Sequence, residues 1–175
     1  MPALAYFITF STYGARLHGD ERGSVDRNHN IAGEPLLPAD DELQHNREAL
    51  MTDPEYRMEP SDRKTVLASV RQHAGFRGWV LLAVHVRTTH VHIVVTGDVV
   101  PERMMLEFKA YATRALNQTT GGAKRRHWAR HGSTRWLNTE NSLRRAIKYV
   151  VDEQGEPMAV YQANVTDEPR PPGSG

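Results

Sequence analysis

The sequence lacks cysteine entirely, and none of its 175 positions begins a run of 18 apolar residues. The first absence excludes disulfides and thiolate metal sites, and the second predicts that no membrane-spanning helix is present. Aromatic residues are few, at 7%, beside 39% hydrophobic and 25% charged residues. The first ten residues contain no basic region, so we expect no signal peptide, a cytoplasmic location and no membrane partner.

Charge is unevenly distributed along the chain, although the net charge is only +1. Residues 1–60 contain 5 Lys and Arg against 11 Asp and Glu, whereas residues 101–150 contain 11 against 3. Residues 151–175 are acidic again, with 1 against 5. Because phosphate binding depends on local potential, the basic block is compatible with nucleic-acid binding. The alternative is a solvated face whose charges pair with the acidic ends.

Hydrophobic periodicity predicts both strands and helices. We expect strands at 6–10, 79–86, 90–95 and 135–137, a turn at 131–134, and helices at 61 to about 75, 101–117 and 139–151. This order favours an α+β fold, in which an antiparallel sheet has helices packed on one face.

Glycine, proline and aspartate punctuate residues 16–60, which we interpret as an insertion with a short helix at 40–50. The chain is then a single domain over residues 1–165. The polar, Pro- and Gly-rich residues 166–175 are expected to form a flexible tail.

A His-Val-His triplet lies in the predicted strand 90–95. Side chains alternate along a strand, so His90 and His92 point to one face and can converge on one divalent ion. The alternative is one half-buried histidine and one that faces solvent. His85, on the preceding strand, could be a third ligand, a hydrogen-bonding support for the ligands, or neither.

Tyr111 lies in the predicted helix 101–117, on the flank of its apolar stripe. Its hydroxyl could therefore reach a polar site while its ring packs. The alternative is an amphipathic tyrosine at the boundary of the core.

These segments together resemble the HUH endonucleases, named for the pattern His, hydrophobic residue, His. Within that family, the chain is similar to the REP-associated branch of single-tyrosine transposases. The resemblance covers most of the chain and rests on residues 6–10 (YFITF), 86–94 (VRTTHVHIV), 108–117 (FKAYATRALN), Trp128, the turn at Gly132 and the helix ending at 149–151.

The resemblance implies a ferredoxin-like sandwich and a metal-dependent DNA-strand transferase. In such an enzyme His90 and His92 would hold Mg²⁺ or Mn²⁺, and Tyr111 would attack DNA to form a 5′-phosphotyrosine. The implied partner is single-stranded or hairpin DNA. Relatives include monomers and homodimers, and the sequence leaves both open.

One position departs from the family pattern. A polar residue one turn after the tyrosine often completes the metal site, and here that position is Ala115. Glu107 and Gln118 lie near the same helical face and are the candidate replacements, with carboxylate oxygen the better ligand for a hard cation.

Basic residues of the central block are the candidate DNA contacts, since cations follow phosphates and neighbouring tryptophans can stack on bases. They are Lys109, Arg114, Lys124, Arg125, Arg126, Arg130 and Arg135.

Two rival functions remain open. The first is a hairpin-DNA-binding relative that does not cleave, which Ala115 favours. The second is an unrelated metal hydrolase that uses His85, His90 and His92 on a small substrate. The hydrolase would not depend on Tyr111, and the basic block argues against it.

Overall fold

The computed structural model describes residues 3–15, 54–122 and 125–164. Within these residues, five strands form one antiparallel sheet. The strands are β1 (Ala5–Thr12), β2 (Val80–Val86), β3 (His90–Thr96), β4 (Trp128–Leu137) and β5 (Ala159–Gln162). Their order across the sheet is β4-β1-β3-β2-β5, so the first strand of the chain lies near the middle.

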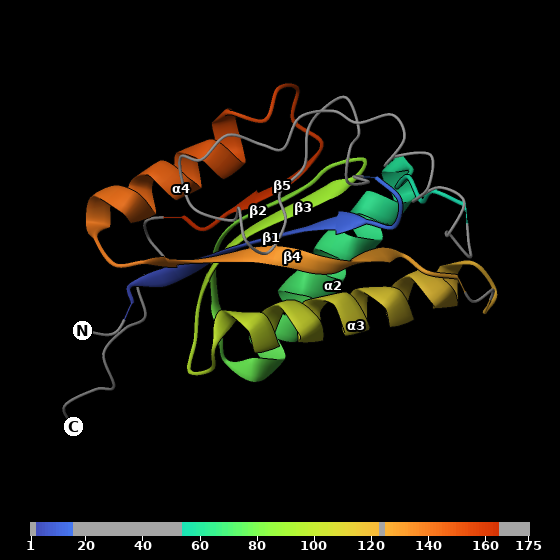
Figure 1. The fold of residues 1–175 in the computed structure, drawn as a ribbon, viewed down its shortest axis with the longest axis horizontal. Helices are drawn as coiled ribbons and strands as arrows, with labels where there is room; N and C mark the ends of the chain where they lie inside the picture. Colours follow the sequence, from blue (N-terminus) through green and yellow to red (C-terminus); the bar gives the residue numbers. More distant parts are fainter. Residues whose placement is uncertain (1–2, 16–53, 123–124, 165–175) are drawn as a thin grey trace, which may run out of the picture.

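Among the described residues, three helices cover the two faces of this sheet (Figure 1). They are α2 (Pro60–Arg77), α3 (Pro101–Thr119) and α4 (Glu140–Asp152). The α+β class and the antiparallel sheet are therefore confirmed. Helices α2 and α3 share one face, as expected, but α4 packs against the other (Figure 1). No helix within the described ranges is long and apolar enough to cross a membrane.

Local sequence signals fix where the helices begin and end. Helix α2 begins one residue earlier than predicted, at Pro60, because Glu59 and Asp62 form a capping box around its first turn. It ends at Arg77, and the capping residue Gly78 has the left-handed φ of 72° that closes a helix. Helix α4 begins after Thr139, whose hydroxyl accepts a hydrogen bond from the Ser142 amide at 3.1 Å.

Alternation along the strands produces a core on each face of the sheet. Ile8, Val91 and Ile93 join the side chains of α2 and α3 in the larger core. Val94 faces the other way and packs with Ala146 and Val150 of α4. Odd-numbered residues of β3 such as Val91 and Ile93 therefore face α2 and α3, whereas Val94 faces α4.

Strand β4 is longer than predicted, and β5 was not predicted. The expected turn at 131–134 is wrong, because Gly132 pairs with Phe10 inside β4. The position needs glycine for another reason: a Cβ there would lie 2.6 Å from the carbonyl oxygen of Thr9. The predicted helix at 40–50, most of the insertion and the tail lie outside the described residues.

Candidate functional site

His90 and His92 share the face of the sheet that α4 covers. They alternate with Val91 and Ile93, which enter the core beneath α2 and α3. His92 is buried, with 7% of its surface exposed. The two imidazole rings are nearly parallel, with centroids 6.0 Å apart and an interplanar angle of 9°. The two histidines therefore share one face of the sheet, as predicted.

Each imidazole is held by a threonine hydroxyl. The Nδ1 atom of His92 lies 3.0 Å from the Oγ1 atom of Thr9, and that of His90 lies 2.9 Å from the Oγ1 atom of Thr89. When Nδ1–H donates to a hydroxyl, Nε2 carries the lone pair that a metal ion requires. The threonines thus set the orientation of both rings, and the tautomer with its proton on Nδ1 leaves Nε2 able to ligate.

Tyr149 of α4 stands beside this histidine pair. Its ring contacts His92 edge to face, with centroids 5.9 Å apart, and contacts Phe7 of β1 at the same distance. Its side chain is partly accessible, at 41% exposed. The sequence did not single out Tyr149 as a site residue. Only the packing of α4 on β1 and β3 brings its ring to the histidines.

Tyr111 lies on the opposite side of the sheet from the histidine pair. It belongs to α3 and stacks on His73 of α2, with ring centroids 4.0 Å apart and an interplanar angle of 21°. The Arg114 guanidinium lies 4.9 Å from its ring centroid. The fold therefore does not bring Tyr111 to His90 and His92 within one chain. Its expected place at the metal site is corrected, because α3 packs on the other face.

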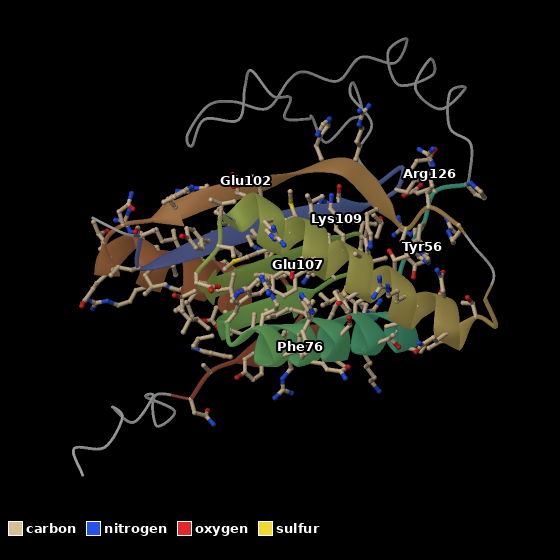
Figure 2. All side chains as sticks on the ribbon, turned by 90° about the horizontal axis from the view of Figure 1, so that it is seen from below. Tyr56, Phe76, Glu102, Glu107, Lys109 and Arg126 are labelled. Carbon is tan, nitrogen blue, oxygen red and sulfur yellow. The ribbon has the colours of Figure 1, made fainter. Side chains whose placement is uncertain are left out.

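Glu107 also lies in the α2–α3 layer, between the two helices (Figure 2). Its carboxylate accepts hydrogen bonds from Nε2 of His73 at 2.7 Å and from Nε of Arg103 at 3.1 Å, and Nε of Arg77 lies 3.2 Å away. Desolvation raises the pKa of Glu107, but the bonds from His73 and Arg103 outweigh it, so the pKa lies below its ordinary value.

The two candidate replacements for the third metal ligand therefore do not reach the histidine pair. Glu107 is bonded on the opposite face, and Gln118 is exposed near the end of α3, the same helix. Both expectations came from the helical face of Tyr111, and they fail with it because the whole helix lies on the other side.

His85 is a structural bridge. The amide of Met158 donates to its Nε2 at 3.1 Å, so its Nδ1 carries the proton and donates to the Val150 carbonyl at 2.9 Å. Burial lowers the pKa of His85, with the Val150 bond opposing and Arg87 adding to the effect. Both nitrogens are occupied, so His85 does not act as a ligand. It fixes the end of α4 that carries Tyr149.

The donor chemistry of this face fits the two-nitrogen part of a divalent metal site. Neutral imidazole is a common ligand of divalent metal ions, and the hydroxyl contacts of Thr9 and Thr89 can provide the outer support that ligating histidines have. Within the described ranges, no three His, Asp or Glu side chains are grouped to hold a metal. Among these residues the histidine pair therefore has no third His, Asp or Glu ligand.

Lys109 is buried between α3 and β4 and is not a surface cation (Figure 2). Its ammonium donates to the carbonyls of Ala129 and His131, at 3.0 and 3.3 Å, where the register between β1 and β4 shifts. Burial lowers the pKa of Lys109 to about 8. Its expected contact with DNA phosphate is corrected, because this side chain satisfies the backbone of a bulged strand.

The remaining predicted DNA contacts have varied surroundings. Arg125 donates to the carbonyl of Pro54 at 2.7 Å and lies over the ring of Tyr56. The Arg126 guanidinium lies 5.9 Å from the ring of Tyr13. Three more arginines are exposed and compatible with phosphate contacts: Arg114, Arg130 and Arg135. Lys124 lies outside the described residues.

The two tryptophans of β4 differ in their exposure: Trp128 is packed against the core, whereas Trp136 is exposed. Trp128 packs against Phe10, with ring centroids 5.0 Å apart, and its Nε1 donates to the Lys109 carbonyl, so it belongs to the core. Trp136 contacts Tyr6 edge to face and is 52% exposed, which leaves a ring that could stack on a base.

Compared with known proteins, the chain matches no family model and no curated sequence. Solved structures with a similar fold include two transposases. One is a REP-associated tyrosine transposase bound to a REP hairpin, with a TM-score of 0.48 and 12% identity over 86% of this chain. This chain spans 66%, just under two thirds, of that protein. The other is a candidate transposase from Deinococcus radiodurans R1, with a TM-score of 0.44 and 14% identity, covering 86% of this chain and 90% of that one.

Proposed function

We propose that this protein is a metal-dependent DNA-strand transferase that nicks and rejoins structured single-stranded DNA, with Tyr149 as its nucleophile. One observation carries the proposal: the ring of Tyr149 lies 5.9 Å from that of His92, on the face where His90 and His92 stand together. The DNA substrate follows from the basic block at 101–150 and from the resemblance of the sequence to HUH transposases.

The reaction balances without an external energy source. The Tyr149 oxygen attacks the scissile phosphorus, and the bond from phosphorus to the 3′ oxygen breaks. The phenol loses one proton and the departing 3′ oxygen gains one, so a 5′-phosphotyrosine and a free 3′-OH result. Attack by a second 3′-OH reverses these steps and joins the new strand, because the phosphotyrosine link conserves the bond energy.

His90 and His92 are the residues that would hold Mg²⁺ or Mn²⁺, with water and DNA oxygens as the other ligands. The bound ion would neutralise charge on the scissile phosphate. Thr9 and Thr89 keep the imidazoles oriented for that task. His85 keeps the end of α4, and with it Tyr149, over the sheet.

A covalent-adduct assay tests the proposal. Hairpin oligonucleotides from the flanks of the protein's own gene are incubated with Mn²⁺ or Mg²⁺ and separated on a denaturing gel. The variants are Tyr149→Phe and Tyr111→Phe, which are matched because the two tyrosines are 41% and 38% exposed. We expect a metal-dependent protein–DNA band that Tyr149→Phe abolishes and Tyr111→Phe retains. A band lost only in Tyr111→Phe would return the nucleophile to α3.

A second function, hairpin-DNA binding without cleavage, is favoured by the lack of a third His, Asp or Glu ligand among the described residues. Hairpin affinity with no adduct under any metal condition would support it and exclude the transferase. A homodimer stays a prediction, which sedimentation of the free protein and of its DNA complex would test.

A further inference from the structure

Arg135 of β4 emerges on the histidine face of the sheet. Phe7 of β1 is paired with Val94 on one side and with Arg135 on the other. Directly opposed residues of antiparallel strands project to the same face. Val94 packs against α4, so Arg135 lies on that face too, one strand away from the Phe7 ring that touches Tyr149.

Arg145 lies one helical turn before Tyr149 on α4. It lies four residues before Tyr149 in α4, and side chains four apart occupy the same side of a helix. Tyr149 packs on Phe7 and His92 from that side. The two arginines therefore flank the proposed nucleophile, Arg135 across the strands and Arg145 along the helix.

Neither arginine is neutralised within the described part of the chain. Helix α4 has three cations, and two of them are paired: Arg144 lies 3.3 Å from Glu140, and Lys148 lies 3.9 Å from Glu153. Arg145 has no such carboxylate among the described residues, and neither does Arg135 of β4. Both side chains are exposed. An exposed guanidinium without a carboxylate partner is suited to bidentate binding of phosphate.

We infer that Arg135 and Arg145 form a phosphate clamp, which binds the backbone phosphates next to the one that Tyr149 attacks. This inference rests on the proposed function and adds to it the path of the strand, between β4 and the Tyr149 side of α4. Both arginines are positioning residues, because they hold neighbouring phosphates and not the reacting atoms. The clamp reads no base, so it binds strands of any sequence.

The test compares Arg135→Gln, Arg145→Gln and their combination with the control Arg144→Gln. Arg144 precedes Arg145 by one residue, so it points about 100° away around the helix and is already paired with Glu140. Affinity for a hairpin oligonucleotide with a single-stranded flank is measured by fluorescence anisotropy from about 50 to 200 mM salt. Adduct formation is timed over a range of DNA concentrations.

We expect each clamp substitution to lower the slope of log affinity against log salt by about 0.7, the value for one contact to single-stranded phosphate. Affinity should fall about fivefold to tenfold for each arginine, and less for Arg145→Lys, which keeps the charge but not the fork. The rate of adduct formation should recover at saturating DNA, because the clamp acts on binding. The Arg144→Gln variant should match the wild type.

Two failures are distinguishable. If the wild type binds DNA and forms the adduct while both clamp variants behave like Arg144→Gln, the clamp is wrong and the proposed function stands. If the wild type shows neither salt-dependent DNA affinity nor an adduct, the proposed function fails and the clamp fails with it. Because all three positions are on the surface, circular dichroism should show intact folding in every variant.

Discussion

His92 and Tyr149 meet edge to face across the space between β3 and α4, with their ring centroids 5.9 Å apart. One residue belongs to the middle of the sheet and the other to the helix that covers it. Every chemical role that we propose depends on this contact, because it brings the proposed nucleophile to the two proposed metal ligands. The predictions below test the residues that hold the two groups in place.

Thr9→Val should weaken metal binding without unfolding the protein. The substitution removes the hydroxyl 3.0 Å from Nδ1 of His92 and keeps the side-chain volume. Loss of such outer support costs about tenfold or more in metal affinity. Calorimetric titration with Mn²⁺ measures the change, and Thr65→Val on α2, which loses a bond to the Ser61 carbonyl, is the control. Equal affinities in the two variants would show that Thr9 does not orient a ligand.

His85→Leu should destabilise the fold, by about 2–4 kcal/mol. The change leaves the Met158 amide and the Val150 carbonyl without their buried partner, and each lost bond costs about 1–3 kcal/mol. Urea unfolding measures the loss. The Mn²⁺ affinity of the folded fraction should stay near that of the wild type. A variant with full stability and no metal binding would instead make His85 a ligand, as the hydrolase alternative requires.

Glu107→Gln should cost stability at neutral pH and leave metal affinity unchanged. The carboxylate accepts bonds from His73 and Arg103, so we expect a loss of about 1–2 kcal/mol. The pKa of Glu107 is lower in the folded protein than its ordinary value of 4.5. Its stabilisation is therefore full above pH 4.5 and disappears as the pH falls through the folded value. Unfolding from pH 7 to 3 should show the difference between the two proteins shrinking in acid; a constant difference would exclude the charged role.

The stability cost of Lys109→Met should grow as the pH rises. Burial lowers the pKa of Lys109 from 10.5 to about 8. Between these values the unfolded chain binds more protons than the folded protein, so the wild type gains stability as the pH rises. Relative to Lys109→Met, we expect a gain of about 1–2 kcal/mol between pH 8 and 10, measured by guanidinium unfolding. A flat difference would mean that the ammonium keeps an ordinary pKa. The salt dependence of DNA binding should not change.

Gly132→Ala should disturb both strand β4 and the orientation of His92. A Cβ at this position would press on Met105 and lie 2.6 Å from the carbonyl oxygen of Thr9. We expect a loss of about 1–3 kcal/mol, together with weaker Mn²⁺ binding, because Thr9 also orients His92. The control is Gly75→Ala in α2, where a Cβ would meet nothing within 4 Å and should stabilise the helix. Similar behaviour of the two variants would contradict the close packing at Gly132.

Local patterns predicted the elements well where one face of an element is apolar and its ends carry capping residues. The shared face of His90 and His92 was predicted correctly, because the alternation of side chains along a strand is a local property of the sequence. The sequence pointed to Tyr111 and did not single out Tyr149, although both tyrosines lie on helices and are partly exposed. Which side of the sheet a helix covers depends on connections and long-range packing, which periodicity does not contain.

Two further errors had physical causes of the same kind. From the local sequence alone, Gly132 was predicted to lie in a turn. The close approach of Thr9 and Met105 explains why a glycine lies inside a strand instead. Lys109 reads as a surface cation in a basic block, yet the bulge in β4 supplies two carbonyls for its ammonium. Both assignments depend on a partner strand that lies far away in the sequence.

The order β4-β1-β3-β2-β5 also determines when the site can exist during synthesis. The histidine strand emerges from the ribosome well before α4, and β1 waits for β4 to complete its pairing. The bridge from His85 closes only after Met158 has emerged. A nascent chain arrested before α4 would therefore carry His90 and His92 without Tyr149, so the proposed reaction could not begin until most of the domain had been translated.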